Sequence, residues 1–89
     1  MSKAIETIKK APLREIITEA DSYPYTSTRK LTGLSVLPTG SVDVVLTINT
    51  DPAIEITIPT DTTFEDDFDV FNQINVTAGD SYFISLRGF

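Results

Sequence analysis

The clearest pattern in the chain is a two-residue alternation of apolar and polar side chains. In residues 41–49 (SVDVVLTIN), every second residue from Val42 to Ile48 is aliphatic. Residues 54–58 (IEITI) repeat the alternation. Because successive side chains of a strand point to opposite faces, this period predicts strands that bury one face.

Turn-forming residues separate the alternating segments, at a spacing typical of antiparallel β-proteins. Gly33, inside the first alternating segment, predicts a bulge or the close approach of another group. No helical period lies between the strands, so a parallel βαβ sheet is not expected. The sequence therefore predicts a mainly β fold, a small antiparallel β-sandwich or barrel of five to six strands. The predicted strands are residues 31–37, 41–49, 54–58, 64–70, 74–78 and 82–87.

The N-terminal part of the chain has a different pattern and is predicted to form a helical or extended arm. Residues 2–10 suit a short helix that ends before Pro12. Apolar side chains then recur at helical spacing over residues 13–20, which predicts a second helix. A strand over residues 14–18 is the alternative.

Charge is divided at nearly the same place. Residues 1–30 contain six Lys or Arg and four Asp or Glu, a net +2, whereas residues 31–89 contain one base and nine acids, a net −8. Because phosphate repels an acidic surface, nucleic acid is not expected as a ligand of the domain. Pattern and charge together predict an N-terminal docking arm, residues 1–22, and an antiparallel β-domain, residues 23–89.

Composition argues against most catalytic and metal chemistry. The 89 residues suit one domain and include no cysteine and no histidine, which removes disulfides, thiolate zinc sites, thiol nucleophiles and the commonest general base. Hydroxyl residues are plentiful, but none has an adjacent base to activate it. We therefore expect a protein that is not an enzyme and binds no cofactor. With no long apolar run and no signal-peptide pattern, we expect no membrane association and synthesis in the cytoplasm.

The acidic run at residues 65–69 (EDDFD) is the one place in the sequence that suggests a cation site. In a strand, Glu65, Asp67 and Asp69 share a face, and carboxylate oxygens are the ligands that Ca²⁺ prefers. The spacing is not that of an EF-hand loop, and so small a domain has little room for two catalytic carboxylates across a sugar. A solvated face is the main interpretation, with the three carboxylates as weak metal candidates.

Two phenylalanines near the C-terminus lie off the predicted core face. Tyr82, Ile84 and Leu86 alternate with Phe83 in the last strand, and Phe89 continues the Phe83 face. If the Tyr82 row is the core, Phe83 and Phe89 are either covered by another chain or belong to a two-sided core.

Three runs carry a family resemblance. Residues 29–36 (RKLTGLSV) and 38–44 (PTGSVDV) resemble the opening of small β-domains in tailed-bacteriophage virions, such as spike-base, head-fibre and capsid decoration proteins. Residues 74–84 (INVTAGDSYFI) are similar to the last hairpin of those domains. The resemblance spans residues 29–88 and implies a short, non-enzymatic, multimeric protein on a particle surface, commonly held through an N-terminal segment. The acidic run is not part of that pattern.

The resemblance and the basic arm together lead to an expected function. We expect a structural virion protein of a bacteriophage, an auxiliary capsid or tail-associated (decoration or fibre-base) component, which docks through its arm onto other virion proteins and forms homo-oligomers. Two other functions stay open: a β-sandwich module that binds a glycan or host receptor through exposed aromatics, and an acidic inhibitor of a host DNA-binding protein. The residues expected to contact the partner are Ile5, Ile8, Lys9, Lys10, Leu13, Ile16, Ile17, Phe83 and Phe89.

Overall fold

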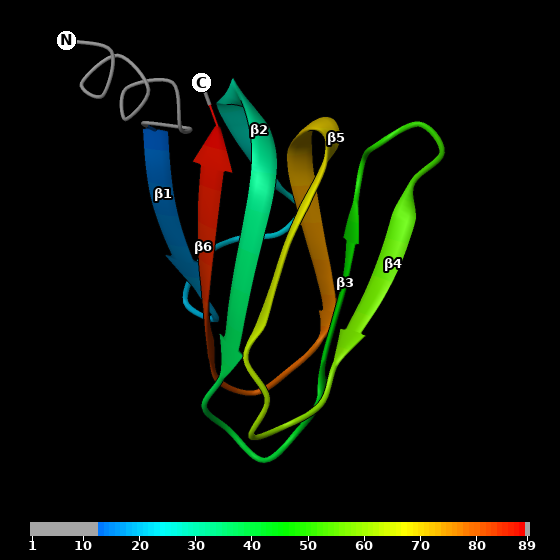
Figure 1. The fold of residues 1–89 in the computed structure, drawn as a ribbon. Coiled ribbons are helices and arrows are strands. Elements are labelled where there is room, and N and C mark those ends of the chain that lie inside the picture. The colour runs from blue at the N-terminus through cyan, green and yellow to red at the C-terminus, as the bar shows by residue number, and fades with distance from the viewer. Residues whose placement is uncertain (1–12, 89) are drawn as a thin grey trace, which may run out of the picture.

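The computed structural model describes residues 13–88, which form a single antiparallel sheet (Figure 1). The strand order is β1-β6-β2-β5-β3-β4, with β1 and β4 at the edges. The prediction of a mainly β fold with five to six antiparallel strands is confirmed. The sandwich or barrel is not confirmed, because all six strands belong to one open sheet. The strands are β1 (Leu13–Thr18), β2 (Tyr25–Pro38), β3 (Val44–Ile48), β4 (Ile54–Ile58), β5 (Phe64–Ala78) and β6 (Tyr82–Gly88).

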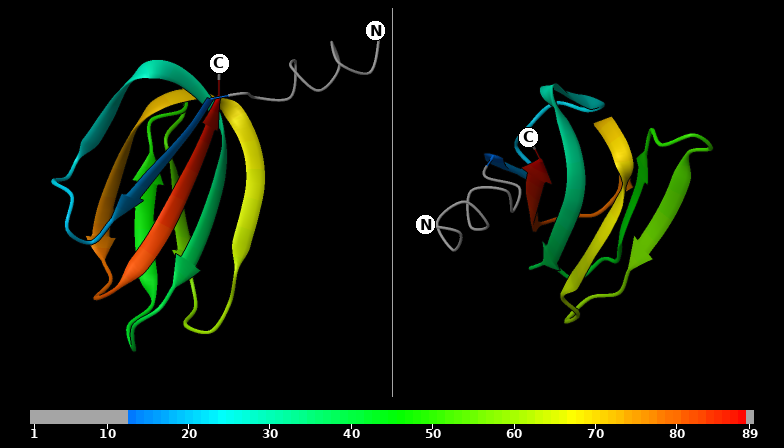
Figure 2. Two further views of the ribbon diagram at one scale, coloured as in Figure 1. Left: turned by 90° about the vertical axis from the view of Figure 1, so that its left-hand side faces the viewer. Right: turned by 45° about the horizontal axis from the view of Figure 1, so that its top comes forward.

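Two long strands, β2 and β5, bend the sheet back on itself. Early in β2, Tyr25 pairs with Ile74 of β5, whereas late in β2, Val36 pairs with Phe64 of β5 on one side and Ile84 of β6 on the other. The registers shift in the middle of β2, which marks the bulged region where the ladder is interrupted. Both strands arch over one end of the molecule (Figure 2). The two ends of each long strand therefore lie on opposite sides of this bend.

The apolar faces of the sheet on the two sides of the bend share one core. Leu31 and Phe71 pair with each other in the bend and are both fully covered. Each buried aliphatic or aromatic side chain contributes about 1.5–3 kcal/mol to the burial term. The core is strictly alternating in β3 and β6, as the period of two predicts. The remaining buried members are Ile17, Leu34, Val36, Val44, Leu46, Ile48, Ile58, Ile74, Tyr82, Ile84 and Leu86.

The helix predicted for residues 13–20 is wrong: the chain forms β1 there, and the alternative of a strand over residues 14–18 is confirmed. β1 pairs with β6 along its whole length. The pairing turns Ile17 inward, where it is 1% exposed, and leaves Ile16 outward at 64%. Ladder hydrogen bonds and burial of Ile17 outweigh the local helical spacing, as tertiary context often does. Residues 13–18 of the expected docking arm are thus an edge strand of the sheet, while the predicted helix at residues 2–10 lies outside the described residues.

Gly88 lets β6 pass directly against β2. A Cβ at this position would clash with the carbonyl oxygen of Lys30 and lie 2.7 Å from Cα of Leu31.

At the other end of the molecule, the carboxylate of Asp80 accepts the backbone N–H of Ser41 at 3.1 Å. That hydrogen bond is the main reason that the pKa of Asp80 lies below its ordinary value.

Candidate functional site

The outward face of β1, β6 and β2 carries a cluster of exposed apolar side chains. Phe83 of β6 lies between its partners Thr18 of β1 and Leu37 of β2 in the ladder. Phe83 is 52% exposed and Leu37 is 44% exposed. Ile16 projects from β1 one position further along this face, opposite Ser85. We call Ile16, Leu37 and Phe83 the apolar cluster.

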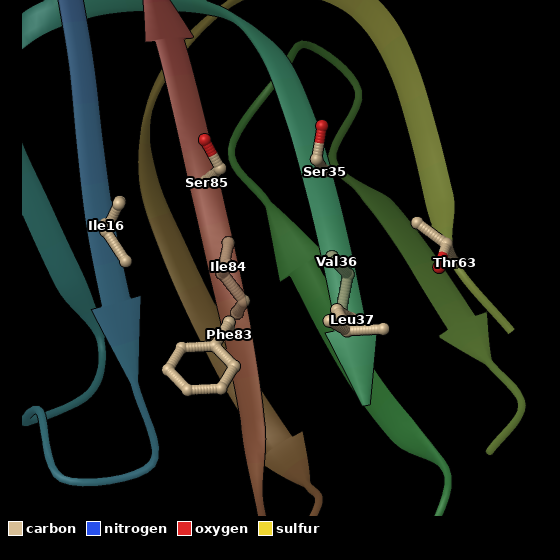
Figure 3. A pocket seen from close by; sticks show the side chains of 8 residues that line it. All are labelled: Ile16, Ser35, Val36, Leu37, Thr63, Phe83, Ile84 and Ser85. Atoms are coloured by element: carbon tan, nitrogen blue, oxygen red, sulfur yellow. The ribbon is translucent and has the colours of Figure 1, made fainter. Parts of the chain in front are cut away.

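The apolar cluster borders a groove because, in the next row across the sheet, β6 and β2 both carry small side chains. Ser85 of β6 pairs with Ser35 of β2, so this row stands lower than Phe83 and Leu37. The resulting hollow has a volume of about 240 Å³. Figure 3 shows the side chains that line it, which come from β1, β6, β2 and the segment before β5. They are Ile16, Ser35, Val36, Leu37, Thr63, Phe83, Ile84 and Ser85.

Arg87 contacts Ser35, one of the residues that line the groove, but does not line the groove itself. From β6 its guanidinium crosses over Gly33 of β2 and donates to Ser35 Oγ at 3.0 Å, to Glu65 Oε2 at 2.6 Å and to Asp67 Oδ1 at 3.2 Å. Gly33 permits this path, because a Cβ there would lie 2.6 Å from Arg87 Nη2. The prediction that Gly33 marks a bulge or a close approach is confirmed on both counts, since a register shift precedes it.

The floor of the groove contains an unusual polar atom. Ser85 Oγ is buried and has no hydrogen-bond partner among the described residues. An unpaired buried hydroxyl costs about 1–3 kcal/mol relative to a paired one. Among residues 13–88, no ionisable side chain lines the hollow, so these residues offer neither a base nor a charged ligand for chemistry on a substrate.

The acidic run does not assemble a metal site in the described residues. Glu65 and Asp67, two of the weak candidates, bind the guanidinium of Arg87. Asp69 is exposed. Within residues 13–88, no group of three His, Cys, Asp or Glu side chains is placed to hold a metal ion. The spacing identified the shared face of Glu65 and Asp67 but not the cation from β6 that neutralises it.

Other titratable side chains form hydrogen bonds at the β1 edge of the sheet. The carboxylate of Glu15 accepts hydrogen bonds from Tyr25 Oη at 2.7 Å and Ser27 Oγ at 2.8 Å. The bond to Glu15 is the main reason that the pKa of Tyr25 rises to about 12. Tyr23 donates to the carbonyl oxygen of Thr18 at 2.8 Å, and burial raises its pKa above the ordinary range. These contacts connect β1 to the start of β2 and are structural.

The sequence pattern predicts part of this face. It placed Ile16 and Phe83 at a partner surface, and both are exposed in the apolar cluster. Ile17 is a correction: it is buried in the core of this chain and is not available to a partner. Leu37 was missed, although its alternation with Val36 indicates an outward side chain. Of the remaining expected contacts, Leu13 begins β1 but its side chain lies outside the described residues, as do Ile5, Ile8, Lys9, Lys10 and Phe89.

Comparisons with protein family models, curated proteins and solved structures found no match to this chain. In residues 13–88, no helix has the length and apolarity needed to span a membrane. The fold and the groove are therefore the basis on which function is assigned.

Proposed function

We propose that this chain is a non-catalytic assembly protein, an auxiliary structural component of a bacteriophage capsid or tail that docks through the outer face of β1, β6 and β2. The observation that carries the proposal is the groove bordered by the apolar cluster, on the side of the sheet opposite the core. A sheet that buries one face in a core does not need an apolar groove on its other face to be stable. Such a feature is typical of a protein–protein contact.

The area on offer suits a contact that forms by side-chain burial. Ile16, Leu37 and Phe83 are 64%, 44% and 52% exposed. Covering the exposed fraction of all three contributes about 2–5 kcal/mol before ordering costs, at about 1.5–3 kcal/mol per fully buried side chain. This is a useful anchor but not a complete interface. Further area has to come from elsewhere on the chain, and the leader that precedes β1 supplies suitable side chains.

The leader, residues 1–12, directly precedes β1 in the sequence, and β1 is the edge strand that carries Ile16. Its apolar residues Ile5 and Ile8 extend the burial, and Lys9 and Lys10 add attraction to an acidic partner surface. The partner proposed is another virion subunit, with copies of this chain also brought together as a homo-oligomer on the particle surface. The resemblance of residues 29–88 to virion β-domains supports this location.

A glycan-binding module would use the same exposed ring of Phe83. Sugar recognition, however, needs polar groups that fix the orientation of the ligand. The groove offers hydroxyls only from Ser35, Thr63 and Ser85, and Ser85 Oγ is covered. We therefore favour an apolar protein segment as the occupant.

The test measures incorporation of the 89-residue chain into phage particles produced in a bacterial host, by quantitative mass spectrometry of purified virions. The variant Leu37→Ser/Phe83→Ser removes most of the groove wall and is expected to weaken docking about thirtyfold, from a loss of about 2 kcal/mol. Val42→Ser is the matched control, because Val42 is 45% exposed, similar to Leu37, and does not line the groove. Thermal unfolding checks that all variants fold.

A second variant tests the leader separately. Deletion of residues 2–12 leaves β1 intact, whereas any longer deletion removes an edge strand of the sheet. We expect this deletion to reduce incorporation into virions. Circular dichroism should show that the fold of the single chain is preserved. Absence of the chain from purified virions would overturn the virion role, and wild-type incorporation of Leu37→Ser/Phe83→Ser would overturn the docking face.

A further inference from the structure

A second hollow lies in the bulged middle of the sheet and shares no residue with the groove. It has a volume of about 310 Å³ and forms where β2 leaves its ladder with β5, beside the end of β3. Its wall includes the side chains of Thr28, Arg29, Lys30, Asn49, Val70 and Asn72. We propose that this hollow binds an oxyanion, a carboxylate or phosphate group.

The charge of the hollow is opposite to that of the domain. Residues 13–88 contain twelve Asp or Glu and four Lys or Arg. Two of those four cations, Arg29 and Lys30, line the hollow, and no acidic side chain from this described part of the chain lines it. Neither forms a salt bridge within the described residues, whereas Arg87 forms two. Acids are three times as numerous as bases in this part of the chain, yet Arg29 and Lys30 have no acidic partner in it. The hollow is therefore a basic site that an external anion can reach.

The amide network in the wall adds a neutral donor. Asn49 Oδ1 accepts the backbone N–H groups of Asn72 and Gln73, both at 2.9 Å. This fixes the orientation of the Asn49 amide, so its Nδ2 donates to Asn72 Oδ1 at 2.8 Å. The oxygen of the Asn72 amide is thereby occupied, and its Nδ2 makes no hydrogen bond in the described residues. The Asn72 amide, a residue of the wall, therefore keeps its N–H donors available for a ligand.

The donors suit an anion with several oxygens. A guanidinium, an ammonium, the Asn72 amide and the Thr28 hydroxyl come from two strands that face each other across the interrupted ladder. Charge-assisted hydrogen bonds to oxyanions are stronger than neutral ones, and Arg and Lys are their usual donors. Because Arg29 and Lys30 are exposed, salt screens the attraction and the expected affinity is weak, in the millimolar range.

The test is a titration of the ¹⁵N-labelled full-length chain with sodium phosphate and, separately, with sodium acetate. Sodium chloride keeps the ionic strength constant. We expect saturable shifts of the amide signals of residues 28–30 and 72. Saturation by phosphate alone assigns the ligand as a phosphate group, and saturation by acetate as well assigns any oxyanion, a carboxylate included.

Three variants separate a built site from general surface charge. Arg29→Gln/Lys30→Gln is expected to weaken binding at least about fivefold. Asn72→Asp keeps an oxygen for Asn49 Nδ2 but replaces the free amide donor with an anionic oxygen, so it should abolish binding with the fold intact. Arg14→Gln, which removes an exposed cation outside the hollow, should have no effect. Shifts that do not saturate with either anion, or an equal loss in Arg14→Gln, would overturn the proposal.

Discussion

Gly33→Ala tests how β2 accommodates the side chain that crosses it. Gly33 lies in β2 between Arg87 of β6 and Asp67 of β5. An added Cβ would lie 2.6 Å from Arg87 Nη2 and 2.7 Å from Nε. Arg87 is flexible, so it can move away, but it then gives up its hydrogen bonds to Ser35, Glu65 and Asp67.

The size of the effect follows from exposure. The Arg87 side chain is 16% exposed, whereas Glu65 and Asp67 are 66% and 84% exposed. Because both carboxylates are largely exposed, each ion pair contributes about 0.2–0.5 kcal/mol, and the bond to Ser35 contributes about 0.5–1 kcal/mol, so displacement costs about 1–2 kcal/mol. Glycine inside a strand is itself about 0.5–1 kcal/mol less stable than alanine. We therefore expect Gly33→Ala to destabilise the wild-type chain by about 0.5–1 kcal/mol, the difference between these terms.

In an Arg87→Ala background the same substitution meets no obstruction. It should then stabilise the chain by about 0.5–1 kcal/mol, so its effect changes sign. Urea unfolding of the wild type, both single variants and the double variant measures the coupling free energy, expected at about 1–2 kcal/mol. Repeating the cycle in about 1 M NaCl should reduce the coupling, because screening weakens the exposed pairs. A coupling below about 0.3 kcal/mol, or stabilisation in both backgrounds, would refute this reasoning.

Two further predictions concern the packing of the strands. Gly88→Ala should destabilise the chain by about 2–3 kcal/mol in urea unfolding, because its Cβ meets the backbone of Lys30 and Leu31, which cannot move aside as a side chain can; an unchanged midpoint would contradict the close approach. Tyr25 should titrate at about pH 12 in the folded chain, against an ordinary value of 10.0. Its raised pKa favours the neutral phenol, so the stability that it contributes is complete below pH 10.0 and is lost as the pH rises towards about 12. Absorbance titration of the phenolate, with Tyr25→Phe as the difference reference, checks this; a transition near the ordinary value would contradict the hydrogen bond to Glu15.

The strands with a clear alternation, β3, β4 and β6, could be predicted from sequence because their period is local. Alternation placed Val44, Leu46 and Ile48 on one buried face and set Phe83 opposite the Tyr82 row. A strand has this period whatever its neighbours are, so pattern alone suffices.

The helix prediction for residues 13–20 failed because a short apolar segment fits both periods. Ile16 and Ile17 suit a helix face by spacing, but they also suit the two faces of a strand. Pairing with β6 decided between them, and that partner is at the other end of the chain. The same limit hid the bend, since nothing in the local pattern of residues 64–78 indicates that one strand spans both halves of the sheet.

By itself, the sequence determined that strongly alternating segments such as residues 44–48, 54–58 and 82–87 are strands, which of their faces is apolar, and that the charges are unevenly distributed. Tertiary structure decided which strands are neighbours, and with them the two candidate sites. The groove exists because Ser35 and Ser85 come together between larger side chains, and the basic hollow exists because a register shift sets Arg29 and Lys30 beside Asn72. The physical reason is that strand order and register depend on hydrogen bonds between distant residues, which no local period specifies.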